Sequence, residues 1–236
     1  MTTDQKTALI TGASKGLGFA LAENLARKGW KLLINARDAR QLLSAKNFLQ
    51  RFTEVVAISG DVRDEIHLWQ LAEALAQHQW KVDLVVNNAS TLGVSPLQPL
   101  LSHPVDNLHL VFHTNLIAPV SLLQKVQSYL KDGATIVNVS SDAGAEAYEK
   151  WGAYGGSKAG LDHLTAILGK ENPQFHFYAF DPGDMRTDMH QAAFPGEDIS
   201  DRPTPTEYAV PAILHLVKGT LPNGRYTPQL LKLQQA

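Results

Sequence analysis

The chain has 236 residues, which is long enough to bury a large hydrophobic core, and open α/β chains of this size commonly form one domain. Its 21 basic and 23 acidic residues give a formal net charge of -2 without a long run of like charge, so neither a nucleic-acid-binding surface nor an anionic-membrane patch is indicated. The absence of cysteine excludes thiolate nucleophiles, disulfides and sulfur-ligated metals.

The beginning of the sequence, Met1 to Lys6, lacks the charged-then-apolar pattern of a signal peptide. No stretch of the chain approaches about 18 uninterrupted apolar residues, the length that a membrane-spanning helix needs. We therefore expect a cytoplasmic protein that acts on a small molecule and has neither a nucleic acid nor a membrane as its partner.

Short apolar runs alternate with longer segments in which apolar residues recur every three or four positions, a pattern that predicts alternating strands and helices. The expected strands are Thr7–Thr11, Lys31–Ala36, Val55–Ser59, Leu84–Asn88, Thr135–Ser140, Phe175–Asp181 and Gly224–Thr227. The first six are nearly continuous apolar segments, as in strands that helices cover on both faces. The prediction is one α/β domain over residues 1–236, with a Rossmann-like, doubly wound parallel sheet of about seven strands and a ligand crevice at the strands' carboxyl ends.

The most irregular part of the sequence runs from Asp181 to Pro205 and contains four prolines and two glycines. Long stretches without periodicity inside a compact domain are more often functional loops than domain boundaries. We expect residues 183–205 to form a substrate-binding loop or lid.

A glycine-rich segment, Thr11-Gly12-Ala13-Ser14-Lys15-Gly16-Leu17-Gly18, joins the first strand to a helix expected over Leu17 to Arg27. Glycine permits a tight turn and close backbone approach, and the free amides at a helix N-terminus favour phosphate oxygens. Glycine in such a turn also has a purely steric explanation, but the position after the first parallel strand is the one that dinucleotide binding requires.

This segment resembles the Thr-Gly-x-x-x-Gly-x-Gly loop of the short-chain dehydrogenase/reductase family, and further motifs extend the resemblance along most of the chain. These motifs are Asp61-Val62, Asn87-Asn88-Ala89, Asn115, Ser140-Ser141, Tyr154 with Lys158, and Pro182-Gly183 followed by Thr187. The resemblance implies cofactor contacts at Gly12, Ser14, Lys15, Gly16, Leu17, Gly18, Arg37, Asp61, Val62, Asn88, Ala89, Tyr154, Lys158, Pro182, Gly183 and Thr187. It also implies a catalytic set of Asn115, Ser141, Tyr154 and Lys158, and a homodimer or homotetramer.

Charge at the end of the second strand favours NADP(H) over NAD(H) as the cofactor. NAD enzymes of this architecture usually present an acidic residue there to the ribose hydroxyls, whereas this chain has Arg37. The guanidinium of Arg37 and the amine of Lys15 suit a 2′-phosphate. The alternatives are that both are solvated surface cations, or that the adjacent Asp38 partly neutralises Arg37.

Transfer of a hydride to a carbonyl creates an alkoxide, so the site needs a proton donor. Among the six tyrosines, only Tyr154 is followed by a lysine at the fourth position, and residues four apart share one face of a helix. We expect the Lys158 ammonium to lower the pKa of the Tyr154 phenol, and the resemblance implies that Lys158 also holds the nicotinamide ribose.

Two polar residues are expected to support this pair. Ser141, thirteen residues before Tyr154, matches the spacing of the family's serine, which hydrogen-bonds the substrate oxygen, and Ser140 is the alternative. The resemblance implies that Asn115 holds a water near the lysine, and the alternative is a hydrogen-bonded amide in the core.

Two positions depart from the family pattern, because Ser90 stands where glycine is common and Gly156 stands where a better helix former is typical. Neither change removes a reacting group. His109 and His113 are four apart, but no third ligand follows at a metal-binding spacing, so we expect no metal site.

The sequence therefore predicts an NADP(H)-dependent carbonyl reductase or alcohol dehydrogenase in which Tyr154 is the general acid and base. Trp151, Tyr148, Met185, Met189 and Phe194 indicate an apolar or aromatic substrate, unless they serve only in packing. The alternative function is a redox sensor or scaffold of the same fold that binds NADP(H) without turnover.

Overall fold

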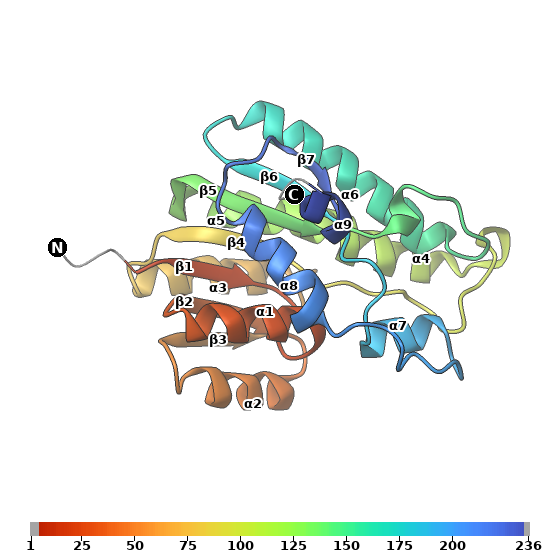
Figure 1. Ribbon diagram of the computed structural model, residues 1–236, viewed down its shortest axis with the longest axis horizontal. Helices are drawn as coiled ribbons and strands as arrows, with labels where there is room; N and C mark the ends of the chain where they lie inside the picture. Colours follow the sequence, from red (N-terminus) through yellow and green to blue (C-terminus); the bar gives the residue numbers. More distant parts are fainter. Residues whose placement is uncertain (1–4, 234–236) are drawn as a thin grey trace.

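In the computed structural model, which describes residues 5–233, seven strands form one parallel sheet in the order β3-β2-β1-β4-β5-β6-β7 (Figure 1). The strands are β1 (Thr7–Ile10), β2 (Lys31–Ala36), β3 (Val55–Ser59), β4 (Val82–Asn87), β5 (Leu130–Val139), β6 (His176–Phe180) and β7 (Gly224–Tyr226). Residues 1–4, on which the expectation of no signal peptide partly depends, lie outside the described residues. The Rossmann-like α/β fold predicted from the sequence is confirmed.

Helices alternate with the strands along the chain. They are α1 (Gly16–Arg27), α2 (Ala39–Leu49), α3 (Glu65–Gln77), α4 (Val105–Phe112), α5 (Ala118–Val126), α6 (Gly152–Glu171), α7 (Asp188–Ala193), α8 (Pro205–Leu216) and α9 (Pro228–Leu233). A π-helical turn over His113–Ile117 joins α4 to α5, and single 3₁₀ turns cover Leu100–Ser102, Gln127–Tyr129 and Asp142–Gly144.

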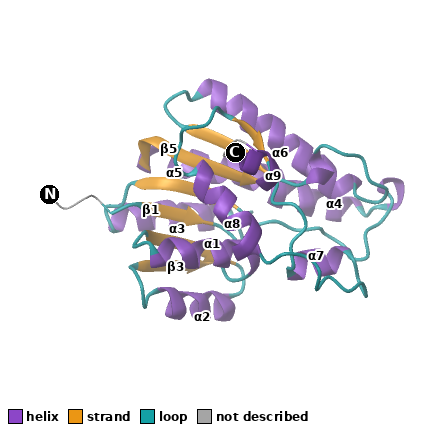
Figure 2. Cartoon of the chain, viewed as in Figure 1, coloured by secondary structure: helices purple, strands orange, loops and turns teal. Residues whose placement is uncertain are grey.

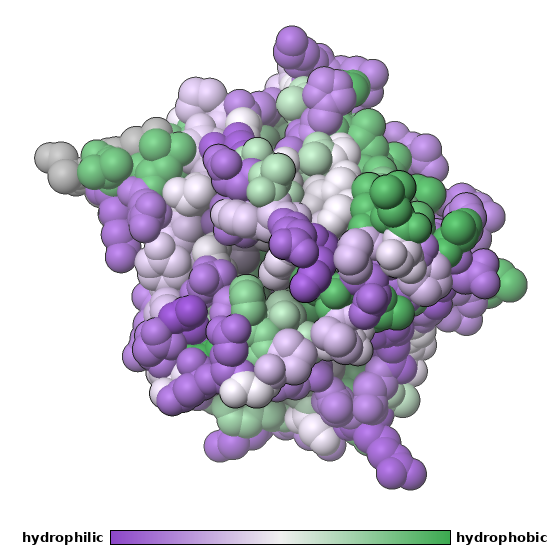
Figure 3. Space-filling view, turned by 90° about the vertical axis from the view of Figure 1, so that its right-hand side faces the viewer, coloured by the Kyte–Doolittle hydropathy of each residue, from purple (hydrophilic) through white to green (hydrophobic). Residues whose placement is uncertain are grey.

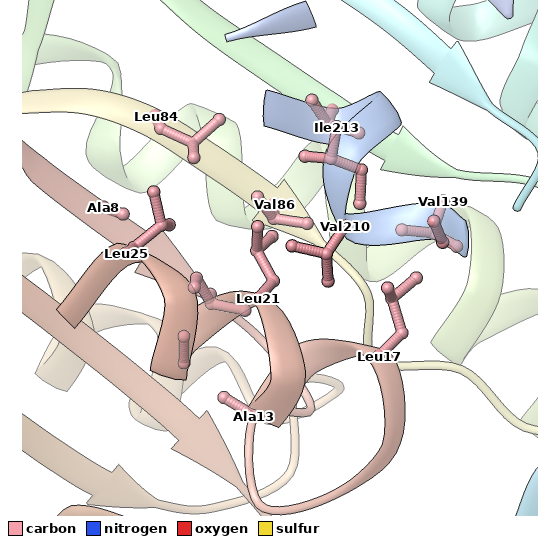
Figure 4. Packing of buried hydrophobic residues seen from close by; sticks show 14 of the residues in the cluster. Ala8, Ala13, Leu17, Leu21, Leu25, Leu84, Val86, Val139, Val210 and Ile213 are labelled. Atoms are coloured by element: carbon pink, nitrogen blue, oxygen red, sulfur yellow. The ribbon is translucent and has the colours of Figure 1, made fainter. Parts of the chain in front are cut away.

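Two hydrophobic cores cover the two faces of the sheet, because neighbouring strand residues point to opposite sides. Ile10 and Ile34 pack with α1, α2 and α8, whereas Leu9 and Leu33 pack with α3 and α5. Figure 1 shows α1 and α8 in front of the sheet and α3 and α5 behind it. In the close-up of the front core, side chains of α1 and α8 meet above β4 and β5 (Figure 4).

The structure differs from the sequence prediction mainly at the ends of elements. β5 begins at Leu130 rather than Thr135, because Leu130 pairs with Val82 before a shift in register. The polar residues that follow Leu130 interrupt the apolar run, so the sequence did not predict this first part of the strand. Residues 183–205, expected to be irregular, contain the short helix α7. This helix starts where the Thr187 hydroxyl accepts a hydrogen bond from the His190 amide.

The turn between β1 and α1 depends on a close backbone approach at Gly18. A Cβ added to this buried glycine would lie 2.4 Å from the Gly12 carbonyl oxygen and 2.6 Å from Asn88 Nδ2. Gly12 itself has φ of +64°, a conformation that side chains disfavour. The glycine-rich segment is therefore packed against the end of β4, and glycine is required there for steric reasons.

Replacing Gly18 with alanine is expected to lower the free energy of unfolding by about 1–3 kcal/mol, because the new methyl group overpacks a backbone contact. The matched control is Gly156→Ala in α6, where the added Cβ meets only the tip of the Phe112 ring at 3.3 Å. There the gain in helix propensity, about 1 kcal/mol, should offset any local adjustment. Urea denaturation of both variants measures the difference, and equal stabilities would show that the turn can relax around a side chain.

Candidate active site

The carboxyl ends of β1, β4, β5 and β6 border a cleft of about 880 Å³. In Figure 2 this end of the sheet carries long loops and α7, which lies beyond the strand tips. Figure 3 looks onto the same end and shows a largely hydrophilic surface with several hydrophobic patches. Such a mixture suits a ligand that has both polar and apolar parts.

The glycine-rich segment forms one wall of this cleft, and Asn88 holds it in place. Asn88 Nδ2 lies 2.9 Å from the Thr11 carbonyl oxygen and 3.0 Å from that of Gly12, and the Thr11 hydroxyl accepts hydrogen bonds from the amides of Asn88 and Ala89. Among the residues that the structure describes, no side chain caps the first turn of α1, whose preceding residue is Lys15. The amides of that turn are therefore available to anionic oxygen atoms.

Two cations lie near the start of this wall. Arg37 lines the cleft at the end of β2, and Lys15 forms an exposed ion pair with Asp188, at 2.6 Å. Asp38, which the sequence left as a possible neutraliser of Arg37, instead caps α2, because its Oδ1 accepts hydrogen bonds from the amides of Arg40 and Gln41. The Asp38 carboxylate is thus directed to the helix amides.

Asp61 and Val62 line the cleft beyond β3, and the Asp61 carboxylate is fixed by Arg63. Arg63 Nη2 donates to Asp61 Oδ2 at 2.8 Å, and the Arg63 amide donates to Asp61 Oδ1 at 2.9 Å. Burial alone would raise the pKa of Asp61, but the hydrogen bonds and charge of Arg63 outweigh it and lower that pKa. Asp61 therefore stays ionised and held in one orientation.

Tyr154 and Lys158 lie on α6, and both are almost completely buried. The amine of Lys158 lies 5.5 Å from the centroid of the Tyr154 ring and donates a hydrogen bond to the Val139 carbonyl oxygen at 2.7 Å. Burial raises the pKa of Tyr154 to about 12 and lowers the pKa of Lys158 to about 8. The direction for Tyr154 is opposite to the sequence expectation, because removal of the phenol from water disfavours its charged form.

Serine hydroxyls from two other segments face the phenol. Those of Ser141 and Ser90 oppose the burial effect on the pKa of Tyr154. Ser141 Oγ also donates to Asp142 Oδ1 at 2.9 Å and accepts a hydrogen bond from the Ala143 amide. Its position beside Tyr154 supports the choice of Ser141 over Ser140.

Asn115 lies in the π-helical turn and does not line the cleft. Its Oδ1 accepts hydrogen bonds from the Thr91 amide and the Ser90 hydroxyl, while its Nδ2 lies within hydrogen-bonding distance of the Thr91 carbonyl oxygen and the Ser157 hydroxyl. These contacts make it a hydrogen-bonded core amide that joins the loop after β4 to α6. Its expected role in holding a water beside Lys158 stays a prediction.

The structure brings nearly all of the sequence-predicted site residues to one cleft. Of the cofactor set, only Gly18 does not line it, and that glycine acts through backbone packing. Sequence reasoning allowed Ser90 a hydroxyl contact near the cofactor but did not place it beside Tyr154, and it missed the contribution of Asp142. Ser90 could have been found because it departs from the family pattern. Asp142 could have been found because it directly follows Ser141.

Within residues 5–233, no group of three or more histidine, aspartate or glutamate side chains is arranged to hold a metal ion. No helix in the same part of the chain is long and apolar enough to cross a membrane.

Comparison with known proteins agrees with this geometry. The family model for short chain dehydrogenases matches residues 6–198. The rhamnolipids biosynthesis 3-oxoacyl-(acyl-carrier-protein) reductase of Pseudomonas aeruginosa is 33% identical, over 70% of this chain and 66% of its own length. The NADPH-dependent pterin aldehyde reductase of Arabidopsis thaliana is 29% identical, over 91% of this chain and 90% of its own.

A solved structure of a Shigella flexneri short chain dehydrogenase in complex with NADP superposes with a TM-score of 0.89. It is 25% identical, and the match covers 96% of this chain and 98% of that one. The family model covers most of the chain, and the fold and the cleft agree with it. The protein therefore belongs to the short-chain dehydrogenase family of oxidoreductases.

Proposed function

We propose that this protein is an NADP(H)-dependent oxidoreductase that interconverts carbonyl compounds and secondary alcohols, with Tyr154 as its general acid and base. The observation that carries the proposal is that Tyr154, Lys158 and Ser141 share one cleft with the glycine-rich segment and Arg37. The proposed cofactor-binding residues and the proposed catalytic residues lie at the same edge of one sheet, which supports one catalytic domain. The cytoplasmic location and the homodimer or homotetramer stay predictions of the sequence.

The cleft fits a phosphate-bearing dinucleotide. A Cβ at Gly12 would lie 2.9 Å from Asn88 Nδ2, so this turn is closed to side chains and presents its backbone. The uncapped start of α1 would hold the phosphates, and Pro182, Gly183 and Thr187 line the opposite side of the cleft. When bound, the cofactor supplies the hydride, which no amino-acid side chain can provide.

The protein's own groups account for the proton and for polarisation of the substrate. In reduction, the carbonyl carbon gains the hydride while its oxygen takes the proton of the Tyr154 hydroxyl, so that a carbonyl becomes an alcohol and the phenol becomes a phenolate. The Ser141 hydroxyl, which donates to Asp142 Oδ1 in the absence of substrate, would turn to donate to the same oxygen as charge develops. The buried amine of Lys158 lies 5.5 Å from the centroid of the Tyr154 ring, and in its charged form it would stabilise the phenolate that forms. Oxidation of an alcohol reverses each step.

An aromatic cluster centred on Trp151, which lines the cleft beside the reacting phenol, favours an apolar or aromatic substrate. The Trp151 ring contacts the rings of Tyr154 at 5.7 Å, Phe194 at 5.9 Å and Tyr148 at 6.4 Å between centroids. Flat substrates gain edge and stacking contacts from such a wall. Suitable probes are benzaldehyde for reduction and 1-phenylethanol for oxidation, within a broader panel of carbonyls and alcohols.

Arg37 and Lys15 support the preference for NADP(H), because both are cations at the wall where a 2′-phosphate would lie. The Asp38 carboxylate is directed to the amides of α2 rather than to Arg37, and the Arg37 charge also acts on the carboxylate of Asp61. Lys15 is held near the same place by its ion pair with Asp188.

Tyr154→Phe is expected to lower kcat by about 100-fold or more while NADPH affinity changes less than about 3-fold, because only the proton donor is removed. Loss of NADPH absorbance with the substrate panel measures turnover, and NADPH fluorescence measures binding. Tyr129→Phe, at the opposite end of β5, is the control. If the wild type binds NADPH but turns over none of the panel, the protein is a sensor or scaffold instead.

Arg37→Ala is expected to raise the KM for NADPH by about 10-fold or more and that for NADH by less than about 3-fold, because it removes a charge that only the 2′-phosphate meets. Steady-state kinetics with both cofactors measure the two effects. The control, Arg40→Ala, removes a cation from the first turn of α2 that does not line the cleft. Equal effects of Arg37→Ala on both cofactors would remove the phosphate assignment.

A further inference from the structure

Arg225 lies in the middle of β7, outside every motif discussed so far, and its guanidinium joins three segments of the site. Its Nη2 donates to the Ser141 carbonyl oxygen at 3.0 Å and to Asp181 Oδ2 at 2.9 Å. Its Nε donates to Asp162 Oδ2 at 3.0 Å. One side chain thus connects the ends of β5 and β6 to α6.

Two of these partners lead directly to groups of the proposed site. Asp181 uses its other carboxylate oxygen, Oδ1, to accept the Gly183 amide at 2.9 Å, so it shapes the turn that carries Pro182 and Gly183. Asp162 follows Lys158 by one turn of α6, and its charge raises the pKa of Lys158 against the effect of burial.

Burial makes the Arg225 contacts energetically important. The side chains of Asp162 and Asp181 are 16% and 8% exposed, whereas that of Arg225 is 32% exposed. A buried carboxylate that loses its cation is strongly destabilising, because its charge is left without water or a partner. A guanidinium suits this place because it is always ionised and offers several donors in one plane.

We infer that Arg225 is a positioning residue that fixes Ser141 and the turn over residues 181–183 relative to α6 while balancing the charges of Asp162 and Asp181. This role deepens the proposed function and rests on it, since it concerns how the substrate-polarising serine and the cofactor-facing turn are held. Arg225 does not line the cleft, so it acts through the residues that it holds.

The second part of the role of Arg225 is electrostatic, and it should be visible in the pKa of Tyr154. The groups facing the phenol are Lys158 on the same helix, Ser141 and Asp142 after β5, Ser90 after β4, and Asp181 after β6. The Asp181 carboxylate raises the pKa of Tyr154. Without Arg225, more of that negative charge reaches the phenol, and the pKa of Tyr154 rises further.

Hydrogen exchange of the protein without substrate tests the positioning role. In Arg225→Met, amide exchange over residues 181–187 should be about 3- to 10-fold faster than in the wild type, because the turn loses its tether. The NADPH dissociation constant should rise by a similar factor. Arg225→Lys keeps the charge but not the planar fork, so it should also accelerate exchange.

The pH dependence of NADP⁺-linked oxidation of 1-phenylethanol tests the electrostatic role. Oxidation needs the phenolate, so its rate rises with pH through the pKa of Tyr154. At each pH below the pKa of Tyr154, Arg225→Met should lower the rate by about 3- to 10-fold, which corresponds to a rise of 0.5–1 unit in that pKa, whereas Arg225→Lys should leave the rate unchanged. The double variant Arg225→Met with Asp181→Asn removes the unbalanced charge and should return the rate to its wild-type value.

The control is Arg27→Met, which removes an arginine from an exposed ion pair with Glu23 on α1. Wild-type exchange and NADPH affinity in Arg225→Met would overturn the positioning role. The positioning role is also overturned if exchange and NADPH affinity change equally in Arg27→Met. It is overturned as well if exchange becomes faster by the same factor throughout the protein, as a lowered Tm alone would cause. An unmoved pH profile, or a double variant that is not restored, would overturn the electrostatic role. If the wild type binds NADPH but turns over no substrate, the proposed function is overturned instead. The positioning role is then tested by hydrogen exchange alone, because that measurement does not need turnover.

Discussion

Parallel pairing of β1, β4, β5 and β6 sends four segments of the chain out of the sheet at one edge, and the site depends on this constraint. Ile10 pairs with Val86, and Val86 pairs with Val137, so the residues that follow these strands leave the sheet side by side. The register thereby brings together the glycine-rich segment, the loop after β4 and the serines after β5. Side chains then refine a site whose location the backbone has already determined.

Burial decides the electrostatic state of Tyr154 and Lys158, the pair to which we assign proton transfer. It disfavours both the Tyr154 phenolate and the Lys158 ammonium, and it raises the pKa of the first to about 12 and lowers the pKa of the second to about 8. The chain's own groups therefore hold the phenol in its protonated form near neutral pH, which is the form that donates a proton to a reduced carbonyl. Spacing along a helix brings the amine close, but desolvation sets the sign of the pKa change.

Local sequence patterns predicted the sheet and most of the cleft. Lys31–Ala36 and Val55–Ser59 have the predicted bounds because continuous apolar runs between polar turns define a buried strand. Contacts between distant segments left no such pattern: Arg225 lies 44 residues from Asp181 and 63 from Asp162. The bonds of Asn115 to Ser90 and Ser157 were hidden for the same reason, since the fold alone determines which residues become neighbours.

The energetic cost of burying Lys158 beside Tyr154 and Ser141 favours an enzyme over a protein that only binds NADP(H). In the proposed function, the phosphates of the cofactor are held by the glycine-rich segment and the cations Lys15 and Arg37, none of which belongs to α6. Lys158 is nevertheless buried, with 2% of its surface exposed, and this loss of contact with water is the main cause of its lowered pKa. Burying an amine opposes stability, and groups with such perturbed pKa values are found more often at functional sites than elsewhere. The desolvation of Lys158 is such a cost, and it occurs beside a phenol and a hydroxyl. We expect this arrangement at a site where protons are transferred.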